Sequence, residues 1–292
     1  MSNVKADLLQ LARRAGARTG LPPISQIYIP EPDIEQTHTE FGVIILADGS
    51  AGLYYAWLGE SQQGMSHRFP PQEFIGKSPL ELMRLYESGD EADCSIGLAA
   101  ISAITQCIYR RAGYKLQTAG NTMGNLDFLP GDHIGMVGYF PSLVRRLREQ
   151  GIRLTVIEKK VKFHESGSLV NVTPDPEKLS GCNKVIITAA TLLNNSVDSI
   201  LEYSVGAKQT VIVGPTAGFF PDPLFSRGIT AMGGTEIIQP DSLIDRLKND
   251  QGMGKAAQKY LIDRVEYPGF DKLLKLIQDQ ILRSEAERGV NR

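Results

Sequence analysis

The sequence has few cysteines, and their spacing excludes the sites that cysteines usually build. Cys94, Cys107 and Cys182 are the three cysteines among 292 residues, and they lie 13 and 75 positions apart. An odd number at these separations fits neither a disulfide framework nor a Cys-x-x-Cys zinc site. Because unpaired cysteines suit a reducing compartment, we expect the protein to be cytoplasmic.

An excess of one charge is also missing. The chain carries 31 basic and 33 acidic residues, its formal net charge is -2, and no Lys/Arg run exceeds two residues. A surface that follows the phosphates of a nucleic acid needs clustered positive charge. Nucleic acid is therefore not expected as a partner.

Long uninterrupted apolar runs are missing as well. The N-terminal segment MSNVKADLLQLARRAGARTG carries charges between its apolar positions. No later apolar stretch approaches the roughly 20 residues that span a bilayer. We therefore expect neither export nor a membrane partner.

The first part of the chain predicts antiparallel strands followed by helices. Apolar residues recur at helical spacing over residues 4–18, and a second helix is predicted to begin after Ser78, which fits a capping box. A third is predicted from Ser95 to Ala112. The predicted strands are Gln26–Ile29, Phe41–Ala47 and Ala51–Leu58. This order is typical of an α+β domain.

Beyond residue 130 the pattern changes to alternating strands and helices. The predicted strands are four short runs rich in Val and Ile: Ile134–Phe140, Leu154–Glu158, Lys184–Thr188 and Thr210–Gly214. Strands of this kind, separated by helical segments, predict an α/β fold with a Rossmann-like parallel sheet. Residues 115–130 are the predicted linker, and we place the domains at 1–118 and 119–292.

In an open parallel sheet the ligand crevice lies outside the carboxyl ends of the strands. The first strand leads into Gly138, Tyr139 and Phe140, in the string G-x-x-G-Y-F-P. This string lacks the G-x-G-x-x-G spacing of a dinucleotide site, which disfavours NAD or S-adenosylmethionine as the cofactor. Tyr139 and Phe140 can line a site or simply pack between helix and sheet.

The second strand ends in Glu158, twenty residues beyond Gly138. That spacing matches the acid that accepts hydrogen bonds from ribose hydroxyls in dinucleotide folds. A carboxylate at a strand end is also a common solvated residue. His164 follows in a polar loop and is either a proton carrier, a metal ligand or a surface residue.

The loops after the third and fourth strands are rich in uncharged hydrogen-bonding groups. The candidate ligand-binding residues here are Thr188, Thr191, Asn194, Asn195, Gly214, Pro215 and Thr216. Asn195 has an alternative interpretation as a helix cap together with Asp198. Both loops precede helices or tight turns, so we expect them to bind an anion together without Lys or Arg. Phe219 and Phe220 wall a pocket or cover the core.

Four ordered segments carry a resemblance to a known family. They are VGYFPSLVRRL, VIEKK, ITAATLLNNS and VIVGPTAGFFPDPLF-x-x-G. The chain resembles the putative heavy-metal chelation family, a domain of unknown function, over most of residues 121–265. The resemblance implies a Rossmann-like domain preceded by a smaller domain like the N-terminal domain of enolase, with a ligand cleft between them. We then expect residues 91–95 and Asn121–Asn125 to lie near the Thr191–Asn195 loop.

The histidines give limited support to a metal site. They are scattered, without an HxH, HxxxH or HExxH pair, so a site would need ligands from distant segments, such as Glu158, His164 and Cys94. Cys94 precedes a predicted helix, where a thiolate is favoured, and its alternative is a small buried residue. The sequence leaves open which cofactor the protein binds, a transition metal included. It also leaves open whether the protein forms a homodimer.

Three functions follow from these residues. The first is an enzyme that acts on a small anionic metabolite or a metal chelate, with Glu158 as its general base or a metal ligand. The second is a protein that binds such a molecule without turnover and takes part in metal handling. The third is an enzyme dependent on NAD or S-adenosylmethionine, with a degenerate fingerprint.

Overall fold

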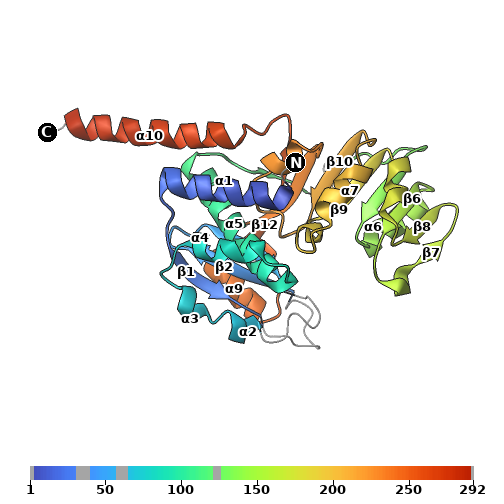
Figure 1. The fold of residues 1–292 in the computed structure, drawn as a ribbon, viewed down its shortest axis with the longest axis horizontal. Helices are drawn as coiled ribbons and strands as arrows, with labels where there is room; N and C mark the ends of the chain where they lie inside the picture. Colours follow the sequence, from blue (N-terminus) through green and yellow to red (C-terminus); the bar gives the residue numbers. More distant parts are fainter. Residues whose placement is uncertain (1–2, 31–39, 57–64, 121–125, 291–292) are drawn as a thin grey trace.

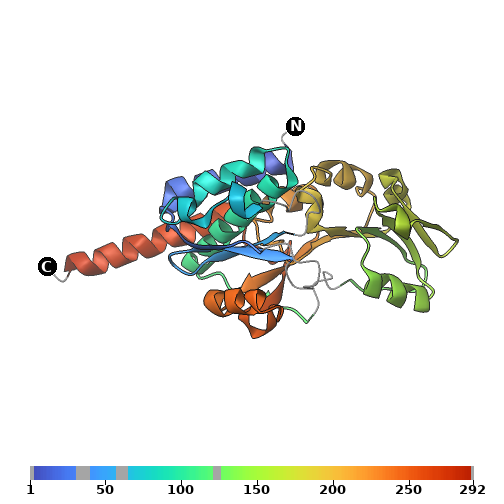
Figure 2. The same ribbon diagram turned by 90° about the horizontal axis from the view of Figure 1, so that it is seen from below.

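The computed structural model describes residues 3–30, 40–56, 65–120 and 126–290. The described chain forms an α/β fold with a three-stranded and a nine-stranded sheet. The views in Figures 1 and 2 place the small sheet and its helices at one end and the strands of the middle of the chain at the other. The predicted α/β class is confirmed.

The N-terminal part is an antiparallel meander covered by helices. Its strands are β1 (Ile24–Tyr28), β2 (Phe41–Leu46) and β3 (Ala51–Tyr55), in that order in the sheet. Its helices are α1 (Val4–Thr19), α2 (Met65–Arg68), α3 (Pro71–Phe74), α4 (Pro79–Met83) with the 3-10 turn η2 (Arg84–Glu87), and α5 (Glu91–Arg111). Between β2 and β3, Gly49 has φ +82°, and the carboxylate of Asp48 accepts the N–H of Ser50 at 2.9 Å. The predicted three-stranded meander is confirmed.

Helix α5 is the central core helix of the protein. It begins earlier than predicted because Asp90 caps it, accepting the N–H groups of Ala92 and Asp93. The helix lies directly on β3, since a Cβ added at Gly52 would be 2.1 Å from the carbonyl oxygen of Ala99. With 21 residues it is long and apolar enough to cross a membrane, so the expectation that no stretch approaches that length is wrong. Its apolar residues are buried inside the protein instead.

The large sheet has six parallel strands at its centre. In chain order these are β5 (His133–Val137), β6 (Arg153–Ile157), β8 (Val170–Thr173), β9 (Lys184–Thr188), β10 (Gln209–Val213) and β11 (Ala231–Ile237). Numbered 1 to 6 along the chain, they follow the order 3-2-1-4-5-6, which is that of the doubly wound dinucleotide-binding fold. All four predicted parallel strands are present at the predicted places.

The sheet is mixed, whereas the sequence predicts a purely parallel one. The antiparallel edge strands are β4 (Gln117–Thr118) and β12 (Ala257–Asp263) on one side and β7 (Glu165–Ser166) on the other. The remaining helices are α6 (Pro141–Glu149), α7 (Val197–Tyr203), α8 (Asp222–Phe225), α9 (Pro240–Lys248) and α10 (Phe270–Val290). Both views show α10 extending away from the body toward the C-terminus.

The two predicted domains pack closely against each other. Leu243 and Leu247 of α9 share a buried cluster with Val43 and Leu53 of the N-terminal sheet. A larger core cluster joins α5 to residues of β9, β10 and β12. The division at residues 118 and 119, and the likeness of the first part to the N-terminal domain of enolase, stay predictions.

Polar contacts hold the amino ends of β5 and β9, opposite the edge where the predicted site residues lie. His133 Nδ1 lies 2.8 Å from the carbonyl oxygen of Gly181, which makes this nitrogen the donor. Nε2 lies 2.8 Å from Thr155 Oγ1 and therefore accepts. Burial, together with the charge of Arg153, lowers the pKa of His133 below its ordinary 6.5.

The lowered pKa of His133 predicts that the protein loses stability as the pH drops below 6.5. The unfolded chain takes up a proton near pH 6.5 while the folded protein still keeps His133 neutral. Neutral His133 thus makes its full contribution to the free energy of unfolding above pH 6.5, and this contribution decreases below that pH. Urea midpoints at about pH 7.5 and 5.5 measure the change, and His133→Gln should reduce it. His164→Gln, which removes an exposed imidazole, is the control; equal wild-type midpoints at both pH values would contradict the account.

Candidate functional site

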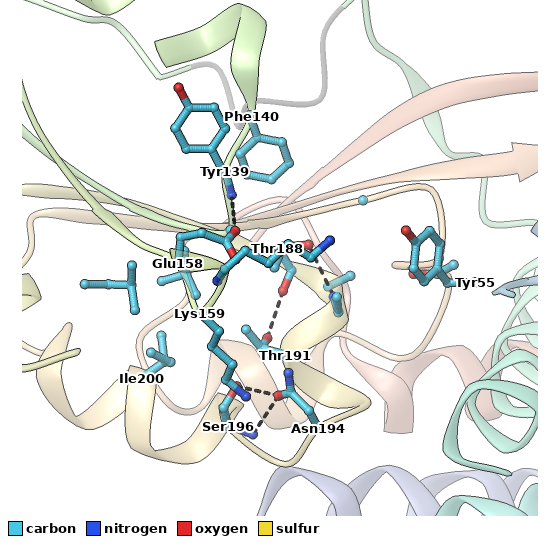
Figure 3. A pocket seen from close by; sticks show the side chains of 18 of the residues that line it. Tyr55, Tyr139, Phe140, Glu158, Lys159, Thr188, Thr191, Asn194, Ser196 and Ile200 are labelled. Atoms are coloured by element: carbon cyan, nitrogen blue, oxygen red, sulfur yellow. Dashed lines mark hydrogen bonds between the residues drawn. The ribbon is translucent and has the colours of Figure 1, made fainter. Parts of the chain in front are cut away.

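A cavity of about 700 Å³ opens at the carboxyl ends of the parallel strands. It lies where β5 meets β9, the point at which the strand order reverses, and this is where open α/β sheets bind ligands. Figure 3 shows its side chains converging from several strand ends. The predicted site residues that line it are Gly138, Tyr139, Phe140, Glu158, Thr188, Thr191, Asn194, Gly214, Pro215 and Thr216.

Glu158 is half-buried, and backbone groups fix its carboxylate. Its Oε2 accepts the N–H of Tyr139 at 3.2 Å, and its Oε1 accepts the N–H of Lys160 at 2.8 Å. The carboxylate thereby joins the turn after β5 to the turn after β6 (Figure 3). It faces the cavity as predicted and does not pair with Lys159 or Lys160 in the described structure.

Tyr139 and Phe140 combine the two roles that the sequence left open. Both line the cavity, and both also pack against the core on one face of the large sheet. The Tyr139 ring stacks on Phe163 with centroids 4.5 Å apart, which fixes its position. Gly138 precedes them at φ +88°, and a Cβ there would approach Thr188 Cγ2 to 3.0 Å. A side chain at this turn would be strained and crowded.

The loop after β9 is a 3-10 turn, η5 (Ala189–Leu192), stabilised by its own side chains. Thr188 Oγ1 accepts the N–H of Ala190, and the Thr191 hydroxyl donates to the Thr188 carbonyl at 2.8 Å. Asn194 Oδ1 accepts the N–H and the hydroxyl of Ser196. Its NH₂ group is thus the part of the amide that can donate to a ligand.

Asn195 does not line the cavity, which corrects its assignment as a ligand-binding residue. It is exposed and has φ +56°, a left-handed conformation that asparagine tolerates, so it serves the turn into α7. It is not the cap of that helix either, because Ser196 occupies the N-cap position. Asp198 instead accepts the N–H of Val4 at 3.1 Å.

The loop after β10 divides between cavity and core. Gly214, Pro215 and Thr216 line the cavity, but Phe219 and Phe220 are fully buried away from it. Of the two alternatives for these phenylalanines, covering the core is therefore confirmed.

His164 and Cys94 do not contribute to the cavity. The exposed His164 ring donates from Nε2 to the main-chain carbonyl of Glu158 at 2.9 Å. This hydrogen bond stabilises the turn that follows β6. Cys94 lies in the first turn of α5 and is buried, and burial raises the pKa of its thiol. Of the two alternatives for Cys94, the small buried residue is therefore confirmed. Lys5 Nζ lies 3.4 Å from its sulfur.

The N-terminal sheet contributes residues that sequence reasoning missed. Glu40, Phe41 and Tyr55 line the cavity, so it is composite, as expected. The contribution comes from β2 and β3 and not from residues 91–95, and the predicted Asn121–Asn125 lie outside the described residues. The lining residues that were not among the named candidates are Lys159, Lys160, Pro174, Pro176, Ala189, Ala190, Ser196, Ser199 and Ile200, together with Val137 and Ile157 at the strand ends.

The donors in the described structure do not suit a bare heavy-metal ion. Among residues 3–30, 40–56, 65–120 and 126–283, no three His, Cys, Asp or Glu side chains gather as a metal site. Soft metals prefer thiolate and imidazole ligands. Cys94, Cys107 and Cys182 are all buried, and none of them lines the cavity. The cavity itself offers carboxylates, hydroxyls and an amide.

The family model described as "DUF364: Putative heavy-metal chelation" matches residues 121–266. An uncharacterized protein of Methanocaldococcus jannaschii is 27% identical over 208 residues, which are 70% of this chain and 78% of that protein.

Two solved structures of proteins with unknown function from this family are similar in fold. The one from Pyrococcus horikoshii has a TM-score of 0.64 and 20% identity, over 89% of this chain and 99% of that one. The one from Desulfitobacterium hafniense DCB-2 has a TM-score of 0.62 and 20% identity, over 88% and 98%. At this identity they show a shared fold alone.

Proposed function

The chain belongs to the putative heavy-metal chelation family, DUF364, and from this premise we propose that it binds a small organic molecule in the cavity at the strand ends. Any metal enters together with that molecule, as a chelate. The observation that carries the proposal is the position of a cavity of about 700 Å³ at the reversal of strand order. A cavity of this volume suits a metabolite, and this location is where the fold binds its ligands.

The composition of the lining supports a chelate over a bare ion. A metal that already has organic ligands needs hydrogen-bond partners and apolar contacts from the protein, which Thr188, Asn194, Thr216 and the aromatic residues supply. A bare ion would need several protein ligands at bonding distance. The chain's own part is therefore to bind and orient the organic portion, with Glu158 as a fixed acceptor.

Protein isolated from its native host tests this proposal. Ala190 is half-buried and lines the cavity, so Ala190→Phe fills part of the space without removing core volume. After denaturation, mass spectrometry of the released solution should find an organic molecule with the wild type and at least about tenfold less with Ala190→Phe. Elemental analysis should find any bound metal reduced in the same proportion.

Ala17→Phe, which changes an exposed position of α1 outside the cavity, is the matched control and should carry as much of the molecule as the wild type. Equal amounts from Ala190→Phe and the wild type would overturn the proposed site. A stoichiometric metal without any organic molecule would overturn the chelate.

A further inference from the structure

Glu158 occupies the position at which the doubly wound fold binds a ribose. In that fold a carboxylate after the second parallel strand accepts hydrogen bonds from ribose hydroxyls. β6 is the second strand of the 3-2-1-4-5-6 order, and Glu158 directly follows it. Two backbone N–H groups, at 3.2 and 2.8 Å, hold the carboxylate in place. A carboxylate has about four lone-pair sites, so capacity is left for two neighbouring hydroxyls.

The turn after β5, in contrast, opposes a phosphate. A pyrophosphate needs backbone N–H groups that face it at the start of the first helix. Here the N–H of Tyr139 already donates to the Glu158 carboxylate, and Pro141 at the first position of α6 has no N–H. A phosphate at this turn would meet a negative charge and the rings of Tyr139 and Phe140.

The cavity differs in character on the two sides of Glu158. On the β6 and β8 side it is lined by Ile157, Pro174 and Pro176, whose stiff apolar side chains suit a flat heterocycle, and by the exposed Lys159 and Lys160 next to Glu158. On the β9 and β10 side it is lined by uncharged polar groups, including Asn194 and Thr216. A molecule that spans the cavity would thus have an apolar end, a hydroxylated middle and a polar end.

We infer that the bound molecule is a nucleoside that carries no phosphate. Its base lies against Ile157 and the two prolines, its ribose hydroxyls donate to Glu158, and its 5′ substituent points toward the loops after β9 and β10. This inference rests on the proposed function and names the class of ligand for the same cavity.

Calorimetric titration of the full chain tests the inference with defined probes. The probes are adenosine, guanosine, cytidine, uridine, S-adenosylhomocysteine and NAD⁺. We expect at least one phosphate-free nucleoside to bind at least about tenfold more tightly than NAD⁺. Its 2′-deoxy form should bind about ten- to hundredfold more weakly than the ribonucleoside, because this is the usual contribution of a hydrogen bond to a charged group. Glu158→Gln should weaken the ribonucleoside similarly, and the loss of the 2′-hydroxyl should then matter less, because the two changes remove one interaction.

Glu165→Gln is the matched control, since it removes the same charge from an exposed position outside the cavity, and it should keep the wild-type affinity. Thermal unfolding of Glu158→Gln confirms that the variant is folded. NAD⁺ binding as tightly as the best nucleoside, an unchanged affinity for the 2′-deoxy form, or no nucleoside binding at all would each overturn the inference. In any of these cases the proposed function would still be supported if the wild type isolated from its host carries an organic molecule that Ala190→Phe lacks. If both proteins carry equal amounts of that molecule, the proposed function would be overturned as well.

Discussion

Lys184→Met is expected to lower the free energy of unfolding by about 3–5 kcal/mol, because it leaves a largely buried carboxylate without its cation. Lys184 Nζ lies 2.8 Å from Asp132 Oδ2, and each side chain is 10% exposed. Burial alone would raise the pKa of Asp132, but the hydrogen bond from Lys184, together with those from the Leu129 N–H and Asn183, holds it below its ordinary value. The pair ties the amino end of β9 to the segment that enters β5.

Urea unfolding at neutral pH measures this loss. The double variant Asp132→Asn with Lys184→Met should cost less than the sum of the two single changes, because the residues interact directly. The exposed pair of Arg148 and Glu165 provides a comparison, and Glu165→Gln should cost less than about 1 kcal/mol. A loss below about 1 kcal/mol for Lys184→Met would show that the pair is not desolvated as the structure indicates.

Phe220→Ala is expected to cost about 3–5 kcal/mol, the usual range for removing a buried phenyl ring. The side chain is fully buried and packs edge to face on Tyr109 of α5 and Phe270 of α10, with centroid distances of 6.5 and 4.9 Å. It thereby fixes the loop after β10 to two helices. Molecules of this variant that are folded should keep the shape of the cavity, since Phe220 does not line it.

Denaturant midpoints for Phe220→Ala and the milder Phe220→Leu measure the effect. The leucine variant keeps part of the packed volume and should lose clearly less. Folded Phe220→Ala should still carry the organic molecule found with the wild type. An unaltered stability combined with a loss of that molecule would mean that Phe220 belongs to the site and not to the core.

The strands of the central sheet could be predicted from the sequence because they are buried on both faces. The runs of Val and Ile at β5, β6, β9 and β10 follow directly from that burial. β11 and β12 carry no such signal. β11 contains two adjacent glycines, and β12 is only partly buried. The two-residue strands β4 and β7 depend entirely on their partners in the sheet.

Which residues of the candidate site could be predicted also depends on whether their position follows from local sequence. Glu158, Thr188 and Gly214 could be located because strand ends in a parallel sheet meet at one edge. Phe41 and Tyr55 could not, because their position depends on how the N-terminal sheet packs beside that edge. Asn195 was misassigned because a left-handed turn residue and a ligand-binding asparagine have the same sequence signal.

A crystal structure of the wild-type protein isolated from its native host, without added ligand, shows directly whether the cavity holds an organic molecule. We expect electron density for such a molecule between the ends of β5, β6, β9 and β10, within hydrogen-bonding distance of Glu158. Density for a bound molecule at any other place on the chain, with solvent alone beside Glu158, would contradict this expectation.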